Sequence, residues 1–200
     1  MSEPHWPTIF ALCVLILFWI VFGLTFVFAR PKAPADTVEA KRDPASRWGI
    51  AVQAVGLALV WGLRRTPIGP ILPMPLWAEV IVSVAALMIA TFSVWLSLSS
   101  VRTLGKQWTY VARIIEGHKL VTEGPYSIVR NPIYLGMFGM MLATGILLTP
   151  WWVLCPAAII FLAGNWIRIH SEEKLLHQAF GAEFEAYTQR VPAMFPKIWP

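Results

Sequence analysis

The stretch HKLVTEGPYSIVRNPIYLG, residues 118–136, lies between two long apolar segments and differs from both in character. It contains charged and aromatic residues, and its pairs Gly124-Pro125 and Asn131-Pro132 are turn signals. A proline disfavours helical backbone in the residue before it, so one continuous helix is excluded. Irregular polar backbone beside membrane spans is tolerated where it is buried in protein or lines a wet cavity. We therefore expect the functional site here, although a connector with aromatic anchors at the membrane surface would have a similar composition.

The composition of the 200-residue chain is that of an integral membrane protein, with 57% hydrophobic and 14% charged residues and a mean hydropathy of +0.62. The 11 tryptophans agree, because Trp concentrates at membrane–water interfaces. The net charge of +5 arises from basic residues between the apolar segments and does not indicate a nucleic-acid partner. Cys13 and Cys155 lie in apolar runs, so we expect buried small hydrophobic side chains and neither a disulfide nor a metal pair.

Five apolar segments predict an all-α, polytopic fold with about five transmembrane helices: 8–29, 48–63, 76–99, 133–148 and 151–169. The first is expected to be retained, because no basic residue precedes it as in a signal peptide. Only Thr149-Pro150 separates the last two, which predicts a tight antiparallel hairpin. The chain becomes polar from Arg168, which predicts a helix that leaves the membrane, stops at Gly181 and is followed by a second helix over 182–190.

The distribution of basic residues predicts the orientation of these spans. Loops between five spans alternate between two sides, and 14 of the 16 Lys and Arg residues fall on one of them. Basic loops remain cytoplasmic, so the N-terminus is expected outside and both polar segments at the cytoplasmic face. We divide the chain into residues 1–100, three membrane helices with their loops, and residues 101–200, the half that contains the expected functional site. Without an organelle signal, the expected location is a prokaryotic inner membrane.

Common soluble-enzyme motifs are absent from the sequence. There is no His-Glu-x-x-His zinc motif, Walker loop, Gly-x-Ser-x-Gly elbow or Gly-x-Gly-x-x-Gly loop, so we expect no metal site and no soluble nucleotide-binding fold. Arg168 and Glu172 are four residues apart and share one helix face. That pattern alone favours an ordinary surface ion pair, worth less than about 1 kcal/mol, over a catalytic pair. Glu173 and Lys174 are expected on the same solvated surface.

The second half of the chain contains an ordered set of short motifs. They are His118-Lys119-Leu120-Val121, Gly124-Pro125-Tyr126, Arg130-Asn131-Pro132-Ile133-Tyr134, Arg168, Glu172-Glu173, Phe180-Gly181, Tyr187 and Val191-Pro192. Together they resemble the isoprenylcysteine carboxyl methyltransferase family and, more loosely, the phospholipid methyltransferases. The resemblance covers roughly residues 104–197, and the first three apolar segments match only in hydropathy.

The resemblance implies an integral membrane methyltransferase that binds S-adenosyl-L-methionine (SAM) in a cytoplasmic pocket formed by the 101–134 segment and the C-terminal helices. The implied cofactor-binding residues are His118, Lys119, Leu120, Val121, Tyr126, Asn131, Pro132, Ile133, Tyr134 and Glu172. Glu172 is also an implied catalytic residue, with Arg168 facing the carboxylate of the substrate. The implied partners are a lipidic or small-molecule methyl acceptor and membrane lipids.

The sequence also departs from the family. The usual Arg-His-Pro motif is Arg130-Asn131-Pro132 here, and Asn cannot carry a proton charge. A glutamine that contacts the cofactor in eukaryotic members falls near Arg113, with Gln107 as a remote substitute.

The acceptor is not fixed by these motifs. Methylation of a carboxylate needs no general base, whereas a phospholipid amine or a small thiol would be helped by one, with Glu172, His118 or Glu123 as candidates. Two functions outside methyl transfer also stay open. One is an NADPH-dependent sterol-type reductase, which shares an Arg-x-Pro-x-Tyr pattern, and the second is a non-enzymatic role in the membrane.

Overall fold

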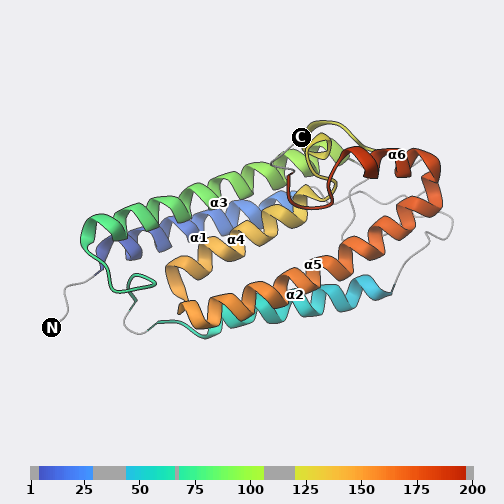
Figure 1. Ribbon diagram of the computed structural model, residues 1–200. Helices are drawn as coiled ribbons and strands as arrows, with labels where there is room; N and C mark the ends of the chain where they lie inside the picture. The colour runs from blue at the N-terminus through green and yellow to red at the C-terminus, as the bar shows by residue number, and fades with distance from the viewer. Residues whose placement is uncertain (1–4, 29–43, 66–67, 106–119, 197–200) are drawn as a thin grey trace.

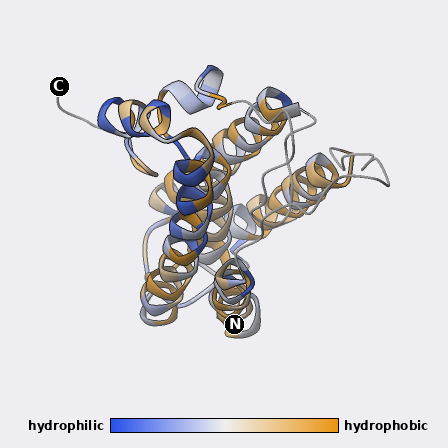
Figure 2. Cartoon of the chain, turned by 90° about the vertical axis from the view of Figure 1, so that its right-hand side faces the viewer, coloured by the Kyte–Doolittle hydropathy of each residue, from blue (hydrophilic) through white to orange (hydrophobic). Residues whose placement is uncertain are grey.

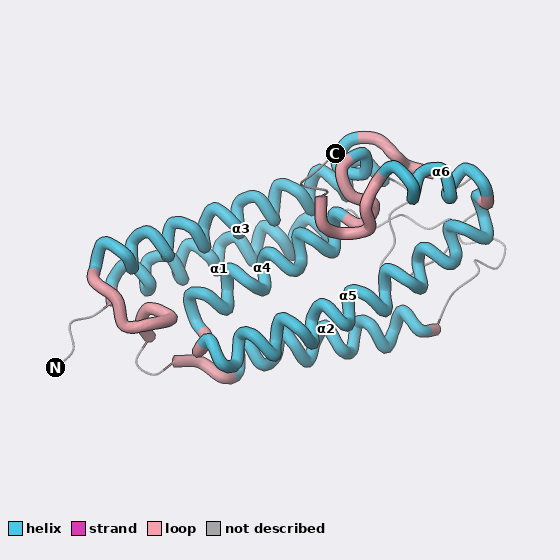
Figure 3. The backbone as a smooth tube through the Cα atoms, in the orientation of Figure 1, coloured by secondary structure: helices cyan, strands magenta, loops and turns pink. Residues whose placement is uncertain are grey.

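The computed structural model describes residues 5–28, 44–65, 68–105 and 120–196, and within these ranges every regular element is helical. In chain order the elements are α1 (Trp6–Phe28), α2 (Ala45–Gly62), α3 (Leu76–Leu104), the short 3-10 helix η2 (Gly124–Ser127), α4 (Pro132–Leu148), α5 (Trp151–Phe180) and α6 (Ala182–Arg190) (Figures 1 and 3). The all-α prediction is confirmed. So are the stop at Gly181 and the short helix that follows it.

Prolines and glycines set the limits of the helices. Pro132 is the first residue of α4, where its missing N–H costs nothing, and Pro150 immediately precedes α5. Gly105 and Gly181 follow α3 and α5 with φ values of 53° and 47°. Positive φ is readily adopted only by glycine, so these residues end their helices where the chain must turn.

Within the described parts of the chain, three helices, α1, α3 and α5, are long and apolar enough to cross a membrane. The apolar α4 has 17 residues, about 25 Å of helix, somewhat less than the hydrocarbon core of about 30 Å. Consecutive helices from α1 to α5 alternate in direction, and η2, α6 and the described C-terminal residues gather at one end of the bundle (Figure 1). Hydrophobic residues run along the helices, and strongly hydrophilic ones collect towards the end where the chain finishes (Figure 2).

The helices α4 and α5 are antiparallel neighbours, as their short connection predicts, but they do not form a tight hairpin. Instead, α5 packs along α2, and α4 packs along α3, which also contacts α1 (Figure 1). Glycines explain the pairing of α2 with α5, because a Cβ on Gly164 would lie only 2.7 Å from the backbone N of Gln53 and 2.8 Å from the backbone O of Gly49. Small residues permit such close approach of membrane helices, and hydropathy alone does not reveal it.

The two cysteines do not lie in the core. Cys13 on α1 and Cys155 on α5 are both free and exposed, so the prediction of buried side chains is wrong. In a membrane protein the positions that face lipid are as apolar as the core, and an apolar run therefore does not distinguish the two.

Two apolar clusters lie on opposite sides of α4. Leu15, Ala90 and Met140 belong to the first, which joins α1, α3 and α4. The second joins α2, α4 and α5 and includes Met194, which follows α6. Through Met194, the C-terminal tail packs against one end of the bundle. This is the end where η2 and the start of α4 lie.

Candidate functional site

Arg168 of α5 is a buried cation, 9% exposed, at the centre of a polar cluster between α2, α4 and α5. Its Nη1 donates a hydrogen bond of 3.1 Å to Oε1 of Gln53. The guanidinium carbon lies 4.7 Å from the centroid of the Tyr134 ring, within the range of a cation–π interaction. The Nη2 atom is 4.0 Å from Oε1 of Glu172, which is an ion-pair distance and longer than a hydrogen bond. The cluster therefore holds the cation from three helices.

Gln53 and Asn165 form the buried part of this cluster. Nε2 of Gln53 donates to Oδ1 of Asn165, and Nδ2 of Asn165 donates to the backbone O of Tyr134 at 3.3 Å and to Sδ of Met194 at 3.8 Å. One hydrogen-bonded chain thus links α2, α5, α4 and the C-terminal tail. Neither residue was predicted to belong to the site. The sequence feature that could have identified them is an amide side chain inside an apolar segment, because polar residues are rare in such segments and often functional.

Glu172 and Tyr134 are brought together, as their common role in the implied cofactor site requires. The Tyr134 hydroxyl donates to Oε1 of Glu172. The Glu172 side chain is 28% exposed, so it lies at the edge of the cluster. An ionised carboxylate has about four lone-pair positions, and the tyrosine uses one of them.

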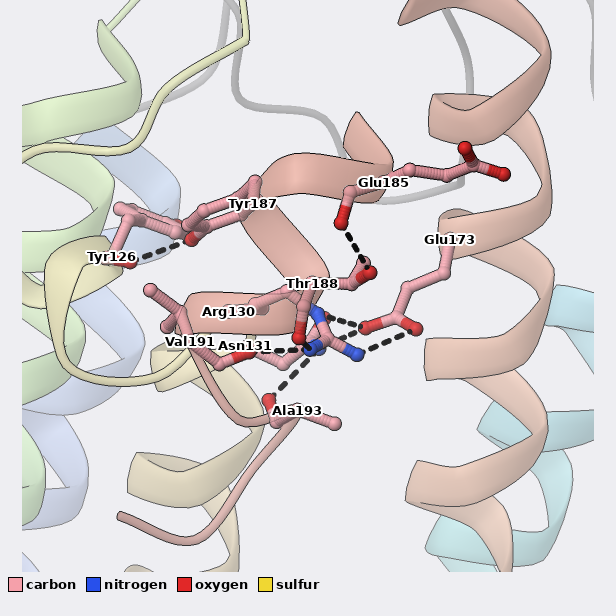
Figure 4. Close-up of polar contacts among 9 residues, drawn as sticks. All are labelled: Tyr126, Arg130, Asn131, Glu173, Glu185, Tyr187, Thr188, Val191 and Ala193. Atoms are coloured by element: carbon pink, nitrogen blue, oxygen red, sulfur yellow. Dashed lines mark hydrogen bonds and ion pairs between the residues drawn. The ribbon is translucent and has the colours of Figure 1, made fainter. Parts of the chain in front are cut away.

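A second polar cluster ties the segment before α4 to α5 and the tail (Figure 4). The guanidinium of Arg130 binds Glu173 in a bidentate pair, with Nε and Nη2 at 2.9 and 3.0 Å from the two carboxylate oxygens. Asn131 Nδ2 donates to Glu173 at 3.1 Å and to the backbone O of Ala193 at 3.0 Å. The backbone N–H groups of Arg130 and Asn131 donate to the carbonyls of Pro192 and Ala193, both at 2.9 Å. The tail is therefore fixed along the start of α4.

This second cluster bears on two expectations, those for Glu173 and Asn131. Glu173, expected on a solvated surface, is only 21% exposed and accepts hydrogen bonds from Arg130 and Asn131, so that prediction is wrong. Asn131, which replaces the family histidine, is 8% exposed and directs its amide at two protein oxygens. Its contact with a cofactor stays a prediction.

Tyr126 and Tyr187 join η2 to α6 (Figure 4). The hydroxyl of Tyr187 donates to the backbone O of Tyr126, and both side chains are buried. Burial raises the pKa of Tyr126 well above its usual value of 10.0, and it raises the pKa of Tyr187 to about 12. Both phenols are therefore neutral at physiological pH, and Tyr187 acts as a hydrogen-bond donor.

Four of the remaining predicted cofactor residues are described by the structure: Leu120, Val121, Pro132 and Ile133. Leu120 packs against the Phe184–Tyr187–Val191 cluster of α6 and the tail. Within the described chain, the backbone N–H groups of Leu120, Val121 and Thr122 donate to no backbone carbonyl. Pro132 and Ile133 begin α4, the former buried and the latter half-buried.

His118, Lys119, Gln107 and Arg113 lie outside the described residues. Among described residues, no three His, Cys, Asp or Glu side chains form a group that could hold a metal ion.

The apolar bundle with an ionisable cluster at one end defines a helical membrane protein whose polar residues gather on α5 beside the start of α4. The model of the phospholipid methyltransferase family matches residues 81–183, just over half of the chain. The chain belongs to this family, whose members use SAM, and the matched residues contain the cluster of Tyr134, Arg168 and Glu172.

Curated relatives fall into two groups by name. The nickel-cobalt-cadmium resistance protein NccN of Alcaligenes xylosoxydans is 30% identical over 76% of this chain and 63% of the relative. The protein-S-isoprenylcysteine O-methyltransferase B of Arabidopsis thaliana is 37% identical over 50% of this chain and 52% of the relative. The human protein-S-isoprenylcysteine O-methyltransferase is 30% identical over 58% of this chain and 42% of the relative. The resemblance stated from the motifs is confirmed, and the chain spans about half the length of these relatives.

Proposed function

We propose that this protein is a SAM-dependent integral membrane methyltransferase that O-methylates a carboxylate on an isoprenylcysteine-like or other lipidic acceptor. The observation that carries the proposal is the convergence of Arg168, Glu172 and Tyr134 at the end of the bundle, within the region that matches the family model.

The chemistry of the residues present fits SAM. The partly exposed carboxylate of Glu172 has acceptor capacity beyond its bond to Tyr134, which suits the hydroxyl and amino donors of the cofactor. The backbone N–H groups from Leu120 to Thr122, which donate to no carbonyl of the described backbone, suit its acceptor groups. Bound SAM would supply an electrophilic methyl group on a sulfonium sulfur.

In this proposal the chain contributes positioning, with no acid–base step. A carboxylate is already ionised at pH 7, so no group has to remove a proton from it. Arg168 would orient the carboxylate, because a guanidinium binds carboxylates with matched, bidentate geometry. Alignment of the reacting groups can contribute up to about 7–11 kcal/mol of the barrier reduction. The apolar residues around the cluster would exclude water.

For the topology, we propose that all of α1 to α5 cross the membrane, with the N-terminus outside and the site at the cytoplasmic face of a bacterial inner membrane. The alternating direction of the helices and the concentration of 14 of 16 basic residues on one side support this arrangement. An acceptor with a prenyl or acyl tail would reach the site from the bilayer, into which it partitions with about 0.8 kcal/mol per CH2 group.

Calorimetric titration of SAM into the purified protein tests the proposal. We expect binding to the wild type and clearly weaker binding to Glu172→Ala. The matched control is Glu185→Ala, which removes an exposed carboxylate of α6 and should leave SAM affinity unchanged. Absence of wild-type binding at millimolar SAM would overturn the proposal, and NADPH binding in its place would favour a sterol-type reductase.

A second candidate role is in heavy-metal resistance, because NccN and the cobalt-zinc-cadmium resistance protein CzcN of Cupriavidus metallidurans are among the relatives. Such a role would act through methylation of a membrane component. Deletion of the gene should then lower growth in cadmium or nickel, and a Glu172→Ala copy should fail to restore it. Growth restored by that copy would separate the role from SAM binding.

A further inference from the structure

The face of α2 that packs on α5 contacts Arg168 at two positions, Gly49 and Gln53. Gly49 and Gln53 are one helical turn apart and share this face. A Cβ on Gly49 would lie 2.4 Å from Cγ of Arg168, so the backbone of α2 rests directly against the stem of the arginine. Gln53 then accepts from the head of the same side chain at 3.1 Å. Helix α2 lies outside the matched family region, residues 81–183.

Gln53 is itself rigidly held, since its Nε2 donates to Asn165 and its side chain is 4% exposed. Arg168 and Glu172, by contrast, lie at the spacing that favours a direct helical ion pair. Their closest N–O distance is nevertheless 4.0 Å. The guanidinium is turned towards Gln53 and lies over the Tyr134 ring. The hydrogen bond to Gln53 therefore fixes the guanidinium at Nη1, while Nη2 is the atom that lies nearest to Glu172.

We propose that Gln53 is a positioning residue that holds the Arg168 guanidinium for the anionic group of the methyl acceptor, so that α2 sets the selectivity for a carboxylate. The inference rests on the proposed function in one respect, the assignment of Arg168 to the acceptor. It extends the site to a helix that the family match does not cover.

The test measures binding of S-farnesylcysteine and of its methyl ester to the full-length protein in lipid nanodiscs, by calorimetry and without SAM. The two probes differ only in the anionic carboxylate. The wild type should prefer the acid by at least about tenfold, the size expected for hydrogen bonds to a charged group. In Gln53→Met, which keeps the side-chain volume but removes the hydrogen bonds, this preference should fall to within about twofold.

A second variant separates positioning from a purely structural role. Gln53→Glu keeps the side-chain length and the acceptor for Arg168 but loses the donor to Asn165, so a structural role that acts through the Arg168 contact would be restored by it. In our proposal its negative charge neutralises the guanidinium, and the preference for the acid should disappear entirely. Thr144→Val is the matched control, because it removes a different hydrogen bond, which Nε1 of Trp19 donates to the buried Thr144, and should keep the wild-type preference.

Each outcome decides the matter. Loss of acid preference in both Gln53 variants, with the control unchanged, supports the proposal. An acid preference retained in Gln53→Met or restored in Gln53→Glu overturns it, as does a wild type that binds acid and ester equally. SAM titration of the same preparations is read separately, because absent SAM binding refutes the methyltransferase function whatever the probes show.

Discussion

Glu173→Ala should destabilise the fold strongly for a single change near the protein surface. Glu173 accepts from Nε and Nη2 of Arg130 and from Nδ2 of Asn131, so the substitution removes three hydrogen bonds to a charged group. Breaking a fully buried ion pair costs about 3–5 kcal/mol. The side chains of Arg130 and Glu173 are 12% and 21% exposed, so water recovers part of that loss. Arg130 also keeps its bond to the carbonyl of Val191. We expect a cost of about 2–3 kcal/mol.

Thermal unfolding in detergent, followed by tryptophan fluorescence, measures this effect. A loss of about 2–3 kcal/mol corresponds to a fall in Tm of about 5–10 °C for a chain of this length. The matched control is Glu185→Ala, which breaks an ion pair with His177 whose side chains are 61% and 54% exposed. Exposed pairs contribute at most about 1 kcal/mol, so the Tm of the control should change little.

A double-mutant cycle with Arg130→Ala tests whether the pair is the cause. The two substitutions should be strongly non-additive, with a coupling energy above about 1 kcal/mol. Equal Tm shifts in Glu173→Ala and Glu185→Ala, or additivity in the cycle, would refute the reasoning. Because Asn131 also joins Glu173 to the tail, limited proteolysis should cut Glu173→Ala after α6 more readily than the wild type.

Three further predictions concern other contacts. Gly164→Ala should lower stability by about 1–3 kcal/mol, since its Cβ would meet α2 at 2.7–2.8 Å, whereas Gly62→Ala, with nothing within 4 Å, should not change the Tm. Tyr134→Phe removes the donor to Glu172 and should weaken calorimetric SAM affinity about three- to tenfold, and an unchanged affinity would contradict a shared cofactor site. The raised pKa of Tyr187, about 12, means that its neutral form stabilises the fold, with the contribution complete below pH 10 and lost as the pH rises to 12. Tyrosinate absorbance of the wild type minus Tyr187→Phe should show this titration, and a midpoint near 10 would contradict the buried geometry.

The features that the sequence predicted well depend on local chemistry. Helix α5 ends where it was expected because Gly181 can adopt a φ of 47°. Residues with a side chain rarely adopt a positive φ, whatever their surroundings in the fold. The start of α4 at Pro132 follows from the same kind of rule. Tyr134, Arg168 and Glu172, named through the family motifs, do lie together.

The features that were missed depend on which helices meet. Hydropathy predicts that α2 and α5 are apolar, but it does not predict that the two helices pack together. Gln53 and Asn165 form their hydrogen bond only because these helices pack together. Glu173 looked solvated because its neighbour in the fold, Arg130, is 43 residues away in the sequence. Likewise, nothing local distinguishes the exposed Cys13 from a buried one.

The pairing of α2 with α5 also bears on how the chain assembles during synthesis. Gln53 and Asn165 are 112 residues apart, which at about 5–20 residues per second is a delay of roughly 6–22 s. During that interval α2 carries an amide that has not yet met its partners, in an environment where unsatisfied polar groups are costly. We expect nascent α2 to remain beside the insertion machinery, or to sit shallowly in the bilayer, until α5 emerges. The last long helix to be made would then complete the insertion of the second.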